Sequence, residues 1–459
     1  MILILGAGLS GLSASYHIGH EKCLLLECQP HPFGHIGSDH RDGFTWDQGP
    51  HVSFTKHEYV KQLFEQSVSS QFEEIEVKVG NYYRGHWIDH PAQTSLHQVP
   101  EPLRSECLMS FLDTRSQAAG GGVTNYQQWL DAAFGPVFAN TFPSVYTKKY
   151  WTLPASALTT DWVGGRILYP EVADVKTGAV HALNRPMHYI NRVRYPKNGG
   201  FQSFAEGLRA GSNINYGAEV VSIDLHRRSV WLANGERFDY DQLVNTLPLP
   251  EFVNACVGAP TAVVNAARQL LCTQLLLVNV AAPHATLRPE HWMYVYDEDK
   301  LTTRITCTEK LSPNNAPEGW TGIQAEVYFS RHRPLPMSPE QVGAQVELEL
   351  IKMGLVDPSR YSAGATSHRH LKYAPWANVV FDKGAVPALE TIWQWMEAFG
   401  LSREVDDLHP LTDWSLAPQN LTRGASLFMA GRFGQWKYFW TDDCVLRGKR
   451  IAEARLGKT

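Results

Sequence analysis

The stretch Ile2-Leu-Ile-Leu5-Gly6-Ala-Gly8-Leu-Ser-Gly11 decides the fold of this chain. Its four apolar residues predict a buried strand, and the GxGxxG spacing leads directly into a helical pattern over about 9–19. The first glycine permits a tight turn, the second lets backbone approach a pyrophosphate, and the third lets helix and strand pack closely. With a second apolar run over 23–27, the sequence predicts a Rossmann-like βαβ unit with a right-handed crossover.

An acidic residue strengthens this interpretation. Glu27 ends the second predicted strand, 21 residues after Gly6, where its carboxylate can accept hydrogen bonds from both ribose hydroxyls. The unpaired N–H groups and the dipole of the predicted helix would meet the phosphate charge. We therefore predict that the cofactor is bound by Gly6, Gly8, Ser10, Gly11 and Glu27.

Two further segments favour FAD over NAD. The loop Pro32–Ser38 extends the acidic end of the second strand with glycines, as in flavoproteins that bind the cofactor in extended form, and Ser38 is a candidate contact. The turn-bounded strand over Glu219–Ile223 resembles the segment that lays backbone against adenine in those proteins, which makes Val220 a candidate.

The C-terminal region supplies the last part of the predicted FAD site. An apolar strand over Leu427–Ala430 ends in Gly431 and Arg432, and a helix follows from about Asp443. Asp442 or Asp443 would cap that helix, and one of the two is a candidate for a ribityl hydroxyl, with plain capping as the alternative. Because four separated segments agree, the sequence predicts a split FAD site.

The order of the predicted elements indicates an α/β protein with three parts. We expect a discontinuous Rossmann-like FAD-binding domain over residues 1–94, 200–255 and 400–459. A helical insertion domain follows over 95–165, where apolar residues have helical spacing. A substrate domain with a mixed or antiparallel sheet covers 166–199 and 256–399, where short apolar runs alternate with turn residues.

Composition excludes several classes of partner. The net charge of −5 gives no global attraction to nucleic acid, and no apolar run approaches the length of an integral membrane segment. The seven cysteines are scattered without CxxC or Cys/His spacing, so we expect no metal site and a reducing, cytoplasmic location. A homo-oligomer is left open.

Six motifs spread along the chain carry a family resemblance. They are Gly43-Phe-x-x-Asp47-x-Gly49-Pro-His51, Asn81-Tyr-Tyr-Arg84-x-x-Trp87, Tyr146-Thr-Lys-Lys149-Tyr-Trp151, Trp162 with Arg166, Thr303-Arg304-Ile305, and Gly431-Arg432-x-x-x-Trp436-Lys437-Tyr438. Together they resemble the UDP-galactopyranose mutases, within the wider amine-oxidase and protoporphyrinogen-oxidase-like flavoproteins.

The resemblance implies roles for particular residues. His51 would lie against the flavin, and Arg166 and Arg304 would act in catalysis and hold the diphosphate. Trp151 or Tyr150 would stack on uracil. The substrate-binding candidates are Arg84, Tyr146, Trp151, Trp162, Arg166, Arg304, Tyr373, Trp436 and Tyr438. Convergent arginines suit a diphosphate because a guanidinium donates two parallel hydrogen bonds.

The implied reaction is a redox-neutral isomerisation. The mutases interconvert pyranose and furanose forms of UDP-galactose through a covalent bond between N5 of the reduced flavin and the sugar, in the biosynthesis of cell-surface polysaccharides. The active cofactor would be reduced FAD, with NAD(P)H as a candidate reductant, and the substrate a nucleotide sugar, most simply a UDP-sugar.

Two departures from the mutase pattern keep an alternative open. Phe381 stands in the stretch where the family places a tyrosine on the diphosphate, and Phe439-Trp440-Thr441 precedes Asp442. The alternative is an FAD-dependent oxidoreductase, such as an amine oxidase or a protoporphyrinogen-oxidase-like enzyme. That chemistry needs an apolar or aromatic cage but no pair of diphosphate-binding arginines.

Overall fold

A five-stranded parallel sheet carries the dinucleotide turn. The computed structural model describes residues 1–117, 122–185, 187, 190–362, 364–415 and 425–456. The strand order is β19-β13-β1-β2-β9, and all neighbours are parallel. The strands are β1 (Ile2–Leu5), β2 (Cys23–Glu27), β9 (Ile214–Tyr216), β13 (Gln242–Asn245) and β19 (Leu427–Met429). Four distant parts of the chain therefore build one sheet, as the predicted Rossmann-like domain requires.

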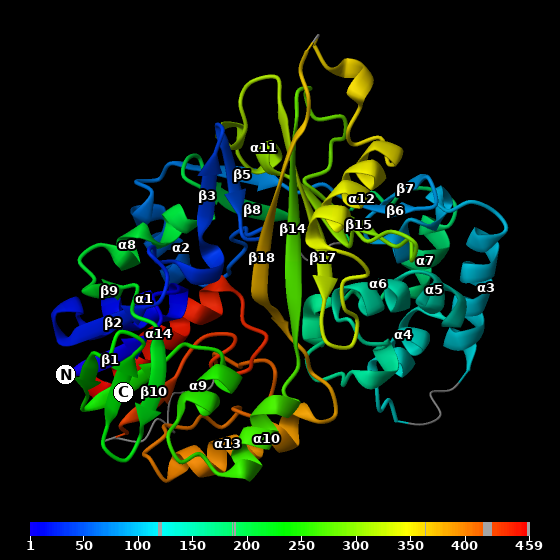
Figure 1. Ribbon diagram of the computed structural model, residues 1–459. Coiled ribbons are helices and arrows are strands. Elements are labelled where there is room, and N and C mark those ends of the chain that lie inside the picture. The colour runs from blue at the N-terminus through cyan, green and yellow to red at the C-terminus, as the bar shows by residue number, and fades with distance from the viewer. Residues whose placement is uncertain (118–121, 186, 188–189, 363, 416–424, 457–459) are drawn as a thin grey trace.

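Two helices from opposite ends of the chain pack beside this sheet. They are α1 (Leu9–Ile18) and α14 (Thr441–Leu456), drawn in blue and red in Figure 1. Ser13 Oγ on α1 donates to the Val445 carbonyl on α14 at 2.7 Å. Gly448 allows this close approach, because a Cβ there would lie 2.4 Å from Ser13 Oγ and 2.5 Å from the Ala14 nitrogen.

Replacing Gly448 by alanine should therefore lower the thermal unfolding midpoint. The added methyl group forces the two helix backbones apart, and overpacking of this kind costs about 1–3 kcal/mol or more. Gly122→Ala is the matched control, because a Cβ at Gly122 would meet nothing within 4 Å. Equal midpoints for the two variants would contradict the close packing of α1 and α14.

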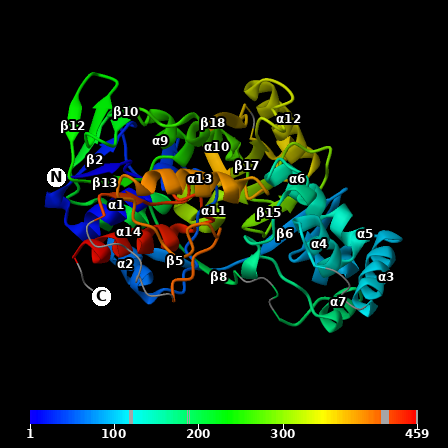
Figure 2. The same cartoon turned by 90° about the horizontal axis from the view of Figure 1, so that it is seen from below.

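Smaller elements complete this half of the molecule. A three-stranded antiparallel sheet follows β9, and two hairpin-like pairs lie near α2. The strands are β10 (Val220–Asp224), β11 (Ser229–Leu232), β12 (Arg237–Asp239), β3 (Ser38–Arg41), β4 (Phe44–Asp47), β5 (Phe72–Glu76) and β8 (Arg192–Pro196). The helices are α2 (Glu58–Ser67), α8 (Glu206–Arg209), α9 (Leu249–Ala255), α10 (Thr261–Gln269) and α13 (Ala385–Glu397). Helices α10 and α13 lie side by side, as Figure 2 shows.

A seven-stranded mixed sheet stands in the centre of the molecule (Figure 1). Its order is β18-β14-β17-β16-β15-β6-β7, with only β15 and β6 parallel. The strands are β6 (Val79–Tyr83), β7 (His86–Asp89), β14 (Cys272–Ala282), β15 (Trp292–Val295), β16 (Arg304–Cys307), β17 (Thr321–Phe329) and β18 (His368–Val379). Strands β6 and β7 belong to this sheet, although residues 1–94 were predicted to belong to the FAD-binding domain.

Each face of the large sheet has its own neighbours. Helix α12 (Pro339–Lys352) covers one face, and its start is fixed by a capping box between Ser338 and Gln341. Val342 and Val346 of this helix pack on Val278 and Ala325 of the sheet. The opposite face carries buried or half-buried polar side chains directed toward the dinucleotide-binding half, including Gln324, which donates to the Asp47 carbonyl at 2.9 Å.

The described residues of 95–165, where a helical insertion was predicted, form mainly helices. These helices are α3 (Leu103–Ser116), α4 (Tyr126–Phe134), α5 (Pro136–Thr141) and α6 (Pro143–Tyr150), and α7 (Val172–Gly178) follows. They lie beyond the β6–β7 edge of the large sheet (Figure 1), where Phe142 packs against Tyr83 with ring centroids 4.9 Å apart. The short helix α11 (Thr308–Leu311) follows β16 and contacts β17. The α/β class with a helical insertion and a mixed sheet, predicted from the sequence, is confirmed.

No helix in the described residues is both long enough and apolar enough to cross a membrane.

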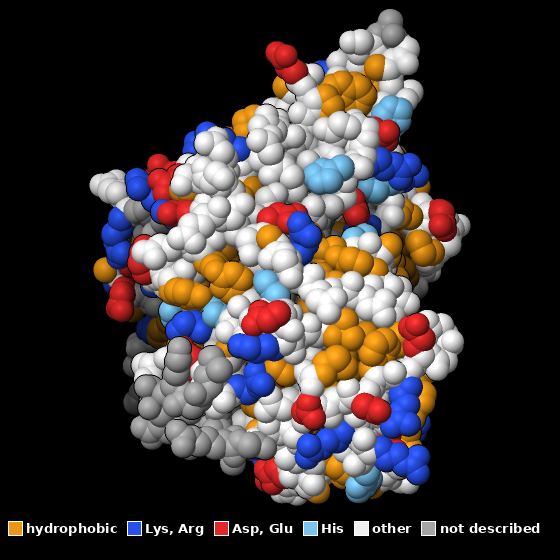
Figure 3. Space-filling model, turned by 90° about the vertical axis from the view of Figure 1, so that its left-hand side faces the viewer, with side chains coloured by type: hydrophobic (Ala, Val, Ile, Leu, Met, Phe, Trp, Pro, Cys, Tyr) orange, Lys and Arg blue, Asp and Glu red, His pale blue; other side chains and the backbone are white. Residues whose placement is uncertain are grey.

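Acidic and basic side chains are interspersed on the face shown in Figure 3. In the described ranges, no three His, Cys, Asp or Glu side chains come together as a metal site would require.

Candidate active site

The glycine turn after β1 is shaped by backbone contacts. Gly6 has φ +97°, and its amide donates to the Leu26 carbonyl at 2.8 Å. A Cβ on Gly11 would lie 2.1 Å from the Gly6 oxygen, so only glycine lets α1 start here. By contrast, a Cβ on Gly8 would meet only the Gly34 Cα, at 3.9 Å. The turn thus presents bare backbone before a ten-residue helix, which suits a phosphate group.

Glu27 is held beside this turn at the end of β2. One carboxylate oxygen accepts from the Ala7 amide at 2.8 Å and the other from the Gln29 amide at 2.9 Å. Its backbone oxygen accepts from the Ala218 amide at 2.9 Å, which brings the start of β10, with Val220, to the same edge. The structure therefore brings together the residues predicted to bind the adenosine end of a dinucleotide.

The C-terminal segment meets the same turn. Gly431 follows β19 with φ +85°, and a Cβ there would lie 3.0 Å from Ser10 Oγ at the start of α1. The N-terminal and C-terminal parts of the predicted site are therefore in contact through Ser10 and Gly431. A cradle lined by Gly6, Gly8, Gly34 and Gly431, with Glu27 at one end, fits a dinucleotide cofactor.

The two aspartates at the start of α14 have different roles. Asp443 accepts from the Trp440 amide at 2.7 Å and from the indole N–H of Trp414, so it caps the helix. Burial raises the pKa of its carboxyl group. Asp442 is also buried and accepts only from the Asp443 amide among the hydrogen bonds of the described residues, at 3.2 Å. Capping thus accounts for Asp443, and Asp442 stays the candidate for a ribityl hydroxyl.

A buried carboxylate ties together the loops beside the glycine cradle. Asp47 accepts from Ser38 Oγ at 2.6 Å, from the Tyr195 hydroxyl at 2.9 Å and from the Phe201 amide at 3.1 Å. The Ser38 amide donates to Gln202. The amide and hydroxyl hydrogens of Ser38 are therefore both donated within the protein. This favours a role for Ser38, a predicted cofactor contact, in positioning the loop. Burial raises the pKa of Asp47 from 3.8 to about 6.

This raised pKa predicts a pH-dependent stability difference between the parent protein and Asp47→Asn. Because the folded carboxyl binds its proton more tightly than the unfolded one, ionisation destabilises the fold above about pH 6, and the cost falls away toward pH 3.8. Asparagine keeps an acceptor oxygen and has no such cost. Urea titrations should show the variant gaining about 2 kcal/mol relative to the parent between pH 4.5 and pH 7.5. A pH-independent difference would contradict this assignment.

Two histidines are candidates for the site: His51 in the Gly49-Pro-His51 turn and His35 in the glycine loop 32–38. His51 Nδ1 lies 3.0 Å from the Gly49 carbonyl, and its ring is 5.5 Å from that of Phe201. Burial, followed by the positive charges of Arg432 and Arg304, lowers the pKa of His51 to about 4. His51 is therefore neutral at pH 7, donates through Nδ1 and presents Nε2 as an acceptor.

The second histidine, His35, was not among the predicted site residues. Its ring lies 5.0 Å from that of Phe433. His35 is solvent-exposed, and desolvation by the neighbouring protein, followed by the charges of His51 and Arg432, lowers its pKa. Its place in the glycine loop 32–38 is the only sequence signal that indicates it.

Arg304 lies on the face of the large sheet opposite α12, where a carboxylate neutralises its positive charge. Its guanidinium donates to both carboxylate oxygens of Glu326, at 2.7 and 2.8 Å. The Tyr328 hydroxyl donates to the same carboxylate at 3.1 Å. This bidentate pair fixes the orientation of Arg304 and leaves its NH1 group outside the pair. The sequence predicted the arginine but not its buried partner Glu326.

A second arginine approaches from the C-terminal segment. Arg432 donates to the Phe439 carbonyl at 2.8 Å and to Asn378 Oδ1 at 3.3 Å, and Asn378 also accepts from the Tyr150 hydroxyl at 3.2 Å. Within the described ranges, Arg432 forms no ion pair with a carboxylate. Its positive charge therefore remains available next to His51.

Tyr150 connects these two arginines. Its ring centroid lies 4.6 Å from that of Tyr328, which bonds the partner of Arg304, and 5.6 Å from that of Tyr146. Tyr146 and Tyr150 are both half-buried on α6. They are therefore the accessible rings of this group and the better candidates for stacking on a planar ligand.

Arg166 lies on the other side of Tyr438. It donates to the Tyr438 carbonyl at 2.8 Å, and its guanidinium carbon lies 4.5 Å from the centroid of the Tyr438 ring and 3.7 Å from that of Trp440. The carbon of Arg432 lies 5.3 Å from the same Tyr438 ring. Trp440, a departure from the mutase pattern, thus covers the guanidinium of Arg166.

The structure corrects several predicted substrate contacts. Trp151 and Trp162 are each 4% exposed and pack on each other and on Tyr438, so their faces serve the hydrophobic core. Trp436 is 1% exposed and also belongs to the hydrophobic core. Motif context predicted stacking surfaces here, but apolar packing covers these indoles.

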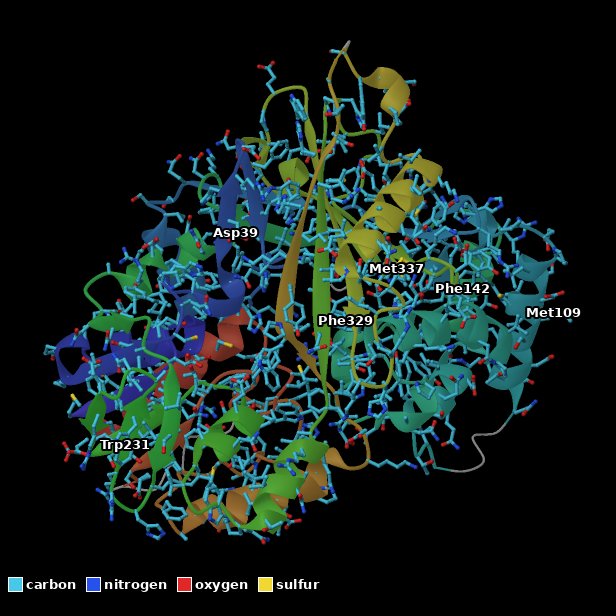
Figure 4. The ribbon with its side chains drawn as sticks, viewed as in Figure 1. Asp39, Met109, Phe142, Trp231, Phe329 and Met337 are labelled. Carbon is cyan, nitrogen blue, oxygen red and sulfur yellow. The ribbon has the colours of Figure 1, made fainter. Side chains whose placement is uncertain are left out.

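Two other predicted contacts lie away from the arginine group. Arg84 is exposed in the β6–β7 turn, where its guanidinium packs over Tyr83. Tyr373 pairs with Leu276 on the α12 face of the sheet, and its ring lies 5.9 Å from that of Phe329, which is labelled in Figure 4. Alternate residues of a strand point to opposite faces, so Tyr373 faces away from Glu326 and Tyr328.

Comparison with known proteins decides the family. The sequence profile of the flavin containing amine oxidoreductases matches residues 9–454. The chain belongs to this family.

Known structures show the same fold as this chain. Reduced UDP-galactopyranose mutase matches with a TM-score of 0.86 and 20% identity, over 100% of this chain and 96% of that one. A protein assigned as a protoporphyrinogen oxidase from Exiguobacterium sp. 255-15 matches with a TM-score of 0.71 and 16% identity, over 99% of this chain and 98% of that one. A redesigned putrescine oxidase matches with a TM-score of 0.63 and 12% identity, over 100% of this chain and 99% of that one.

Family membership agrees with the glycine cradle and indicates a flavin cofactor for this amine oxidoreductase family member. When bound, the flavin supplies the redox or nucleophilic chemistry of such proteins. The residues that would hold it are those of the Gly6–Gly11 turn, Glu27, Gly431 and Asp442.

Proposed function

We propose that this protein is an FAD-dependent nucleotide-sugar mutase that interconverts pyranose and furanose forms of a UDP-sugar. The observation that carries the proposal is the link between Arg432 and Arg304 through Tyr150, whose hydroxyl shares Asn378 with Arg432 and whose ring lies 4.6 Å from that of Tyr328, which bonds the partner of Arg304. A diphosphate needs cationic donors with fixed geometry beside the reacting sugar. Oxidation of an amine, which is neutral or cationic, has no use for two cationic donors.

The protein groups have distinct tasks in this proposal. Arg432, which has no carboxylate partner in the described ranges, supplies net positive charge for the diphosphate leaving group. Arg304, oriented by Glu326, donates directional hydrogen bonds through its outer nitrogen. Arg166 holds Tyr438 and Trp440 in place, and Tyr146 and Tyr150 cover the nucleotide base. Reduced FAD would supply the nucleophile.

A second candidate, net oxidation by an oxidase, has one observation in its favour. Arg304 is already paired with Glu326, and aromatic rings of Tyr146, Tyr150, Tyr294 and Tyr328 surround it, as in an aromatic cage. The two functions differ in their need for oxygen. The flavin would return to its starting state without oxygen in a mutase but not in an oxidase.

The test is an anaerobic assay of the dithionite-reduced holoprotein with UDP-galactose, UDP-glucose and UDP-N-acetylglucosamine, analysed by anion-exchange chromatography. The proposal expects a new UDP-sugar peak of equal mass, formed without reoxidation of the flavin. Arg432→Gln should lose this activity, whereas Arg403→Gln, which changes an arginine paired with Glu397 and Asp407, should keep it. Turnover that requires oxygen and consumes an amine would overturn the mutase proposal.

A further inference from the structure

A second cavity lies where the turn of the β3–β4 hairpin meets the ends of β14 and β18. Its volume is about 280 Å³, and its walls include Arg41, Phe44, Trp46, Trp320, His368 and His370. The hairpin is held against β18 by an ion pair between Asp39, labelled in Figure 4, and Lys372. This ion pair gives the cavity a fixed outer wall.

The cavity is distinct from the candidate active site. His370 lies eight residues before Asn378, which contacts Arg432, on the same extended strand. At about 3.3 Å per residue, the two ends are about 26 Å apart. None of the residues proposed to hold the flavin or the diphosphate lines the cavity.

Aromatic rings form much of the wall. The Trp46 and His370 centroids are 5.3 Å apart at 74°, and Phe44 stacks on Trp46 at 5.4 Å. At the rim, Trp320 and His368 are 6.0 Å apart and nearly parallel, at 14°. A planar ring inserted between two parallel rings needs about 7 Å, twice the contact distance of about 3.5 Å. These walls therefore offer single apolar faces, not a slot.

A chain of hydrogen bonds fixes the polar group on the inner wall. Gln324 Nε2 donates to the Asp47 carbonyl and to Asn279 Oδ1, both at 2.9 Å. This leaves Asn279 Nδ2 facing His370 Nε2 at 2.9 Å. Because an amide nitrogen only donates, Nε2 accepts and the ring proton resides on Nδ1. His370 is therefore a neutral donor in a fixed tautomer.

We propose that this cavity is a binding site for a neutral carbohydrate ring. A sugar ring has an apolar C–H face that packs on one indole and an edge of hydroxyl groups that need both donors and acceptors. The cavity supplies the half-buried indole of Trp320, the neutral imidazole of His370, and Arg41 with its neighbour Asp42, whose opposite charges are 3.4 Å apart. Its volume is near the lower limit of small-molecule sites, which suits one or two sugar rings.

The charge pattern separates this ligand class from others. Arg41 is paired with Asp42 and His370 is neutral, so the walls give no net charge to hold a phosphate or carboxylate. Aromatic heterocycles would gain most from a two-sided slot, which the spacing of Trp320 and His368 does not provide. The proposal does not depend on whether the flavin site isomerises or oxidises its substrate.

The test uses saturation-transfer difference NMR on the holoprotein with excess UDP, so that the candidate active site is occupied. The probes are methyl glycosides of glucose, galactose and N-acetylglucosamine, with lactose, uridine and adenosine, each at up to 10 mM. We expect transfer to the ring C–H protons of at least one glycoside. Trp320→Ala, which truncates a half-buried rim residue, should weaken that binding at least tenfold.

Trp231→Ala is the matched control, because Trp231 is a half-buried tryptophan on β11, far from the cavity (Figure 4). This variant should bind the glycoside as the parent does. The proposal is overturned if no glycoside shows transfer, if only uridine or adenosine does, or if the two variants weaken glycoside binding equally. His370→Phe, which keeps a ring but removes the donor, should also weaken binding, and unchanged affinity would remove His370 from the site.

Discussion

Replacing Glu27 by alanine is expected to lower the affinity for FAD about 100-fold or more. The carboxylate is fixed by the Ala7 and Gln29 amides, and its remaining lone pairs face the edge where ribose hydroxyls would lie. Each hydrogen bond to a charged group contributes about 1.5–3 kcal/mol, so loss of two accounts for a change of this size. Titration of the deflavinated protein with FAD, followed by flavin fluorescence, measures the affinity directly.

Glu21→Ala provides the comparison for this experiment. Glu21 is exposed and lies just before the same strand, so its removal changes the local charge by the same amount without touching the glycine turn. It should bind FAD within threefold of the parent. If Glu27→Ala also binds within threefold, the carboxylate does not contact the cofactor, and its role is limited to holding the turn.

Arg304→Gln is expected to have the second large effect, on both stability and nucleotide binding. It leaves the carboxylate of Glu326, 1% exposed, without its counterion, and breaking a buried pair costs about 3–5 kcal/mol. It also removes the donor proposed for the diphosphate, which should weaken UDP binding about 10- to 100-fold. Isothermal titration of the holoprotein with UDP and thermal unfolding separate the two effects.

The double variant Arg304→Gln/Glu326→Gln tests which effect dominates. Two neutral amides can hydrogen-bond to each other, so the thermal midpoint should return most of the way to that of the parent. UDP affinity should stay low, because the charged donor is still missing. If the double variant regains UDP affinity as well as stability, Arg304 serves the fold alone and the proposed diphosphate site loses one of its two arginines.

Local signals were enough to predict the scaffold of the cofactor site. The glycine spacing, Glu27 and the strand before Gly431 are set by backbone geometry over a few residues, since a positive φ or a close backbone contact admits only glycine. The β-rich character of 256–399, where strands β14 to β18 lie, was also predicted from short apolar runs between turn residues. These features could be predicted from the sequence because steric contacts over a few residues determine them.

The substrate side was less predictable. Arg304 was identified from its motif, but its partner Glu326 lies on the neighbouring strand, and pairing across strands is set by the register of the sheet. Tyr373 was assigned to the substrate, yet the pairing of β18 with β14 turns it to the α12 face. A shift of one residue along a strand reverses the direction of a side chain, and nothing local in the sequence records it.

By itself, therefore, the sequence determined that this protein has a Rossmann-like half, a helical insertion and a mixed sheet, and it predicted a split dinucleotide site. Only the tertiary structure decided that Trp151 and Trp162 are core residues, that capping accounts for Asp443 and not Asp442, and that Glu326 is the partner of Arg304. The reason is physical: glycine turns and apolar strands follow from local backbone sterics and burial. The neighbours of a charged or aromatic side chain depend instead on how distant segments pack.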